Sequence, residues 1–101
     1  MILSEWLETR TPAPPPRLFH RIIEVLGSRV ESEATSAVLL DAAEQLLRAL
    51  TSHATLGRES ALDLLVVDAL VTYAFECAAA SPETLLDTTG QAIERFGAIA
   101  Q

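Results

Sequence analysis

Few side chains in this sequence could do chemistry, and they do not fall into a catalytic or metal-binding pattern. The two histidines, His20 and His53, stand far apart, and neither belongs to the E-x-x-H pair of di-iron carboxylate bundles. One cysteine, Cys77, with two histidines gives no zinc-binding spacing, and the four glycines are too dispersed for a phosphate-binding loop. His53 is expected at the C-terminal end of a helix, where the helix dipole favours a cation. We therefore predict no catalytic residue, no metal site and no cofactor, in a protein that is not an enzyme.

Two acidic side chains, Asp68 and Glu76, could form a carboxylate pair. With Thr72 they follow the spacing i, i+4 and i+8, which places all three on one strip of a helix predicted over residues 61–80. No acid–base partner accompanies them, so we interpret the strip as solvated or as hydrogen-bonded to a neighbouring helix. The rest of this helix is apolar and long enough to span a membrane. An aspartate near the bilayer centre would cost at least about 2.5 kcal/mol, so we predict a buried helix with one wet edge instead.

The segment LGRES, residues 56–60, resembles the L-G-x-D-S motif of acyl carrier proteins. The stretch TTGQAI, residues 88–93, is similar to the last helix of that family. This sequence departs from the motif at Glu59, where the family has aspartate, and at Ala61, where leucine or methionine is usual. The resemblance implies that Ser60 carries a phosphopantetheine group.

A helix-capping role is the interpretation that we favour for Ser60. Ser60 and Asp63 have the spacing of a serine at the N-cap and an acid at the third helical position, and Gly57 would end the preceding helix. The carrier function with Ser60 as its attachment site stays as an alternative.

The composition is that of one acidic, aliphatic domain. The 101 residues carry a net charge of −7, and half of them are hydrophobic. An acidic surface repels phosphate, so we expect neither nucleic acid nor membrane as a partner. Cys77 is expected to be an inert core thiol, and no cationic stretch followed by a long apolar one marks a signal peptide. These features predict a cytoplasmic protein.

Apolar side chains recur at helical spacing along the chain, and no stretch shows the alternation of a strand. We predict an all-α fold, a small four-helix bundle with a short N-terminal helical arm joined by a proline-rich corner. The whole chain, 1–101, forms a single domain. Glu44 and Arg48 have the favourable i, i+4 order of an ion pair, and Ser81 caps the last helix. The arm covers 1–10, the corner 11–16 and the bundle 17–101, with helices at 2–9, 16–27, 34–53, 61–80 and 82–99 and a loop at 28–33.

The last predicted helix, 82–99, has apolar side chains that we expect to be buried in the bundle, among them Leu85, Leu86 and Ile93. Gly90 lies in the interior of this helix, where glycine costs about 1 kcal/mol relative to alanine. Such a glycine is typical of a close helix crossing.

The segment TPAPPP, residues 11–16, contains four of the five prolines of the chain. Pro12, Pro15 and Arg17 spell P-x-x-P-x-R, a pattern similar to ligands of SH3 domains. Proline spacers of this size are also common between helices. We favour a stiff corner in extended polyproline conformation, with Pro16 in the first turn of the next helix.

Helix 61–80 is apolar on nearly every side, and three other helices with a short arm cannot easily cover it. Uncovered apolar patches usually mark partner surfaces, so we predict a helical protein–protein interaction and oligomerisation module. Its partner would be a second copy of the chain, in a homodimer, or another helical protein. A small hydrophobic ligand between helices 34–53, 61–80 and 82–99 is a further alternative. The expected interface residues are Trp6 of the arm, docked on its own bundle or on a neighbouring copy, and Leu70, Tyr73 and Phe75.

Overall fold

The computed structural model describes residues 1–52 and 58–100, which form five α-helices and one 3-10 helix. No strand occurs in these two ranges, so the predicted all-α fold is confirmed. The elements are α1 (Leu3–Glu8), α2 (Pro16–Leu26), η1 (Gly27–Glu31), α3 (Ser36–Thr51), α4 (Arg58–Ala78) and α5 (Pro82–Ala100).

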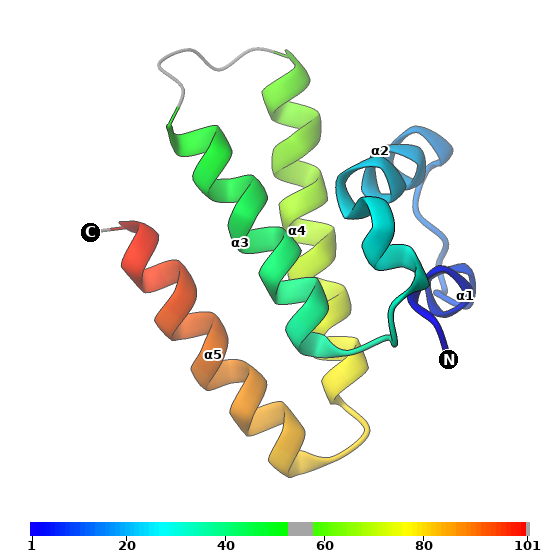
Figure 1. Cartoon of the computed structure of the whole chain (residues 1–101), viewed down its shortest axis with the longest axis vertical. Helices are drawn as coiled ribbons and strands as arrows, with labels where there is room; N and C mark the ends of the chain where they lie inside the picture. The colour runs from blue at the N-terminus through cyan, green and yellow to red at the C-terminus, as the bar shows by residue number, and fades with distance from the viewer. Residues whose placement is uncertain (53–57, 101) are drawn as a thin grey trace.

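An antiparallel pair of helices, α3 and α4, forms the centre of the fold (Figure 1). Helices α1 and α2 pack on one side of this pair and α5 lies on the other. Helices α3, α4 and α5 run up and down as expected for short connections, whereas α1 and α2 cross the pair and are seen nearly end-on. The buried core joins α1 to α4 and comprises Leu3, Leu7, Ile22, Leu26, Leu39, Leu40, Ala42, Ala43, Val66, Leu70, Tyr73 and Ala74.

The ends of the helices follow local capping chemistry. Gly27 ends α2 with φ of 56°, a left-handed conformation that glycine adopts without steric cost. Thr35 caps α3, since its side chain accepts a hydrogen bond of 3.2 Å from the Val38 N–H. Ser81 does the same for α5, accepting from the Thr84 N–H at 3.2 Å, as predicted. The loop expected at 28–33 is mostly the 3-10 helix η1 instead.

The N-terminal arm is α1, and it docks on the bundle of its own chain. Its backbone is tied to the segment after η1 by hydrogen bonds from the Leu3 N–H to the Ser32 carbonyl and from the Ala34 N–H to the Met1 carbonyl. Leu3 and Leu7 are buried, with 0 % and 2 % of their surface exposed. A six-residue helix is too short to be stable alone, so this docking holds it in place.

Trp6 lies half-buried at the edge of the arm, against α4. Its ring meets the Tyr73 ring edge to face, with 6.0 Å between the centroids. The Arg10 guanidinium covers the other part of the indole at 3.7 Å from its centroid. The same arginine donates from Nε to the Trp6 carbonyl, which fixes the end of the arm.

The proline segment 11–16 makes the corner between α1 and α2. Pro15 has φ of −54° and ψ of 145°, close to polyproline II values, and Pro16 is the first residue of α2, as predicted. The Thr11–Pro12 peptide bond is cis.

Replacing Leu7 by alanine should lower the free energy of unfolding by about 2–5 kcal/mol, because the change empties a buried site between α1 and the bundle. Urea denaturation followed by circular dichroism measures this loss. Glu8→Ala changes an exposed neighbour on the same helix and should leave stability almost unchanged. Equal stability of Leu7→Ala and the wild type would mean that the arm does not dock in solution.

Candidate interaction surface

The four predicted interface residues do not form an exposed surface. Leu70 is fully buried and Tyr73 is 9 % exposed, both within the core of the chain. Trp6 and Phe75 are half-buried. The physical reason is that α2, α3 and α5 of the same chain pack on α4, and that Trp6 of α1 meets Tyr73.

The polar strip on α4 lies where it was predicted. Asp68, Thr72 and Glu76 are all exposed. The Thr72 hydroxyl donates to the Asp68 carbonyl one turn earlier at 2.9 Å. Glu76 lies 4.0 Å from the Arg10 guanidinium, so it helps to hold the arm rather than to form an acid–base pair.

Ser60 is not the N-cap of α4, so this prediction was wrong. The helix begins at Arg58, which places Ser60 inside its first turn. Asp63 is engaged by another helix: both of its carboxylate oxygens accept from the Arg21 guanidinium, at 2.7 Å and 3.1 Å. This two-point contact joins α2 to α4. His53 lies outside the described residues, and so do Leu56 and Gly57, the first two residues of the LGRES segment.

The described surroundings of His20 and Cys77 do not give either side chain the partners that a catalytic residue needs. His20 is exposed on α2, with its Nε2 3.8 Å from the Glu24 carboxylate. Cys77 is half-buried on α4, and its thiol donates to the Ala34 carbonyl at 3.5 Å. Burial raises the pKa of the Cys77 thiol, which opposes formation of the reactive thiolate. Among the described residues, no three His, Cys, Asp or Glu side chains converge on a metal-sized site.

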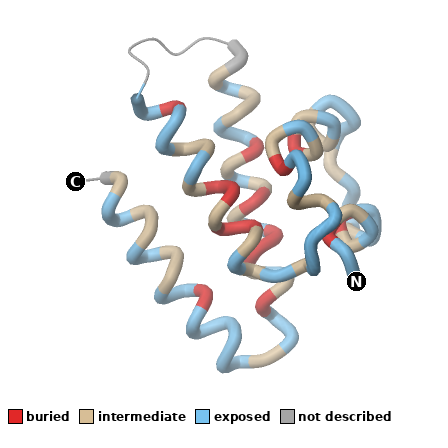
Figure 2. The backbone as a smooth tube through the Cα atoms, viewed as in Figure 1, coloured by how far each residue is buried: buried red, intermediate tan, exposed pale blue. Residues whose placement is uncertain are grey.

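The inner face of α5, defined by Thr88, Ala92, Arg95 and Phe96, attaches this helix to the rest of the fold. Thr88 is the one buried side chain that the structure describes on α5, and its hydroxyl donates to the Ser36 hydroxyl at 3.0 Å. Ala92 and Phe96 pack against the core while remaining partly exposed. Figure 2 shows the result, because α5 is almost free of buried residues while α3 and α4 are rich in them.

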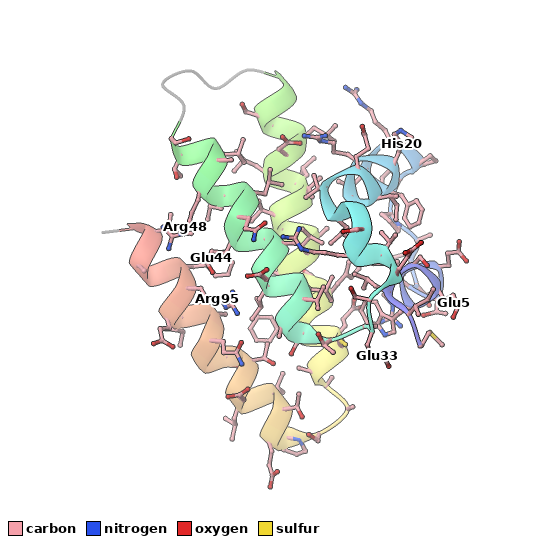
Figure 3. All side chains as sticks on the ribbon, viewed as in Figure 1. Glu5, His20, Glu33, Glu44, Arg48 and Arg95 are labelled. Carbon is pink, nitrogen blue, oxygen red and sulfur yellow. The ribbon has the colours of Figure 1, made fainter. Side chains whose placement is uncertain are left out.

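An ion-pair cluster supplies a second attachment between α3 and α5 (Figure 3). Arg95 of α5 donates to the Glu44 carboxylate at 2.9 Å and to Asp41 at 3.4 Å. Glu44 also accepts from Arg48 at 3.0 Å, which confirms the predicted pair. The hydrogen bond from Arg48, and then that from Arg95, hold the pKa of Glu44 below its usual value, against an opposing contribution from desolvation.

The outer face of α5, defined by Leu86, Gly90, Ile93 and Gly97, is exposed. Leu86 is 74 % and Ile93 69 % exposed, so the prediction that these two side chains are buried was wrong, as it was for Leu85 at 38 %. The reason is that α5 turns Thr88 and Arg95 inward, toward the polar groups on α3. The apolar side chains on the opposite side of the helix then face solvent.

The two glycines of this outer face meet no other described part of the chain. A Cβ atom built on Gly90 or Gly97 would have no neighbour within 4 Å. Gly90 therefore serves no crossing with another helix of its own chain, although each glycine in a helix interior costs about 1 kcal/mol relative to alanine. The sequence does carry a signal for this surface, since Leu86, Gly90, Ile93 and Gly97 repeat with spacings of four, three and four residues.

One surface hollow, of about 310 Å³, is lined by Arg17, Arg21, Leu62 and Asp63 between α2 and α4. It lies away from the site between α3, α4 and α5 that was considered for a small hydrophobic ligand. Two arginines and an aspartate on its walls make it a poor site for such a ligand.

Comparisons of the chain with protein-family models, with curated protein sequences and with solved structures found no match. None of the helices in the described residues has the length and apolar content needed to cross a membrane.

Replacing Glu44 by glutamine should weaken the attachment of α5 and reduce the free energy of unfolding at neutral pH by up to about 1 kcal/mol. Since the pKa of Glu44 is lowered in the folded protein, its contribution is complete above the usual value of 4.5 and is lost as the pH falls through the lowered value. The difference between wild type and Glu44→Gln should therefore shrink on acidification. Urea denaturation at a series of pH values measures it.

The matched control is Glu5→Gln, a change of the same kind at an exposed position on α1. It should show a smaller loss at neutral pH. A wild-type–Glu44→Gln difference that stayed constant down to pH 3 would contradict the role given to this carboxylate.

Proposed function

We propose that the protein is a non-enzymatic helical interaction module that forms a homodimer through the outer face of α5. The observation that carries this proposal is the exposure of Leu86 and Ile93 on a helix that buries little of its own surface. Apolar side chains aligned on one side of a helix are typical of a partner surface, whereas single scattered ones are not. Symmetric dimers are the commonest assembly for a chain with one such surface.

The chemistry of the described side chains supports a binding role over catalysis. His20 is solvated, Cys77 is held as a thiol, and Asp68 and Glu76 lie on a wet edge. A reducing compartment such as the cytoplasm suits a chain whose single cysteine is half-buried and forms no disulfide.

The direct test is sedimentation velocity over a range of protein concentrations. We expect the wild type to shift from monomer to dimer as its concentration rises, and Leu86→Gln/Ile93→Gln to remain monomeric. Both changes lie on exposed positions, so circular dichroism should show a fully helical and stable variant.

Ala98→Gln is the matched control, because it adds the same side chain to α5 at an exposed position outside the outer face. It should dimerise like the wild type. A wild type that stays monomeric at every concentration, or a double variant that still dimerises, would contradict the proposal.

A further inference from the structure

The outer face of α5 alternates large and small side chains in a heptad-like order. Leu86 and Ile93 are seven residues apart, and so are Gly90 and Gly97. In heptad terms the two large residues take the d positions and the two glycines the a positions of one seam. This seam lies opposite Thr88 and Arg95, which hold α5 to α3.

We propose that two copies of the chain pair through their α5 helices in antiparallel orientation, with each large side chain seated on a glycine of the other copy. The inference rests on the proposed function, since it assigns the geometry of that same surface. In an antiparallel pair, a positions face d positions of the partner. Ile93 then lies on the partner's Gly90, and Leu86 on the partner's Gly97.

The order of large and small residues indicates that a second copy of the chain covers the outer face of α5. Read from Leu86 to Gly97, the face is large, small, large, small with spacings of four, three and four. Read backwards it is small, large, small, large with the same spacings. A surface with this property is complementary to itself under a two-fold axis, which is the requirement of an isologous dimer.

The parallel arrangement fits the same face poorly. It would set glycine opposite glycine and leucine opposite leucine, leaving empty layers between crowded ones. The antiparallel arrangement instead fills the open space above Gly90 and Gly97, where no other element in residues 1–52 and 58–100 lies within 4 Å of an added Cβ. Glycine at these positions lets the two helices approach closely.

The size and charge of the surface predict a weak dimer that salt strengthens. The outer face spans residues 86–97, a strip about 18 Å long and about 10 Å wide, below the roughly 800 Å² per partner of a standard interface. Asp87 and Glu94 border one edge of the outer face, and antiparallel pairing brings these edges together. We expect dissociation constants in the micromolar range that fall when salt is raised from about 0.01 M to about 0.15 M.

The test exchanges a large residue with a small one. Leu86→Gly removes a large residue, and Gly97→Leu places leucine opposite leucine, so each should weaken dimerisation about tenfold or more by sedimentation equilibrium. The combined variant Leu86→Gly/Gly97→Leu restores a large residue opposite a glycine in the antiparallel pair. Its dissociation constant should return to within about twofold of the wild type.

Folding does not confound the result for Gly97→Leu. Gly97 faces open space, and leucine is a better helix former than glycine, so Gly97→Leu should melt at a higher temperature than the wild type while dimerising less well. A merely structural role for Gly97 would give the stability gain without the loss of dimer.

Three results would overturn the inference. If the exchange variant stays as weak as the single variants while Leu86→Gln/Ile93→Gln abolishes the dimer, the outer face is an interface but not an antiparallel α5 pair. If no single variant weakens the dimer, α5 does not form it. A dimer that salt weakens would show that the two acidic edges do not meet, and would favour a basic partner surface.

Discussion

The pairing of α3 with α4 is the constraint on which the rest of the structure depends. Helix α4 is apolar on most of its circumference, so it is stable in water only when other helices cover it. Helix α3 takes the largest share of this surface, and α2 adds the bidentate contact between Arg21 and Asp63. The arm, α1, packs beside Tyr73 with Leu3, Leu7 and Trp6. Leu64 and Leu65 of α4 remain exposed.

The central pair is covered unevenly by the other helices, and α5 is therefore attached by fewer buried apolar side chains than α1 and α2. The side of the pair that faces α1 and α2 is closed by buried leucine and isoleucine side chains. The side that faces α5 is joined through Thr88, Ala92, Phe96 and the Arg95 ion pairs, which are worth less per contact than apolar burial. A helix held in this way turns Thr88, Ala92, Arg95 and Phe96 inward and leaves Leu86 and Ile93 outside, where a second copy can cover them.

Much of the fold could be predicted from the sequence because its signals are local. Gly27, Ser81 and Pro16 mark helix ends through backbone chemistry, and the i, i+4, i+8 spacing of Asp68, Thr72 and Glu76 identifies the wet edge of α4. The start of α4 was predicted wrongly, since Ser60 and Asp63 have the spacing of a cap while Asp63 actually binds Arg21, 42 residues earlier. No local pattern encodes that contact.

The orientation of α5 was beyond local reasoning for a similar reason. Its apolar residues cover one broad side of the helix, so periodicity alone does not say which part of that side faces the core. The orientation of α5 is set by side chains of α3. Thr88 donates to Ser36, and Arg95 donates to Asp41 and Glu44. Leu70 and Tyr73, which were predicted as interface residues from the apolar character of α4, are buried within the chain, so this character reflects packing inside one molecule.

The central claim is that a second copy of the chain covers the outer face of α5. Amide hydrogen exchange at several protein concentrations tests this claim most directly. The account predicts that α5 amides become better protected as concentration rises, while amides of α3 and α4, which form the centre of the fold within one chain, keep the same protection. The Leu86→Gln/Ile93→Gln variant should lose the concentration dependence. Protection of α5 that is the same at all concentrations in the wild type would contradict the account.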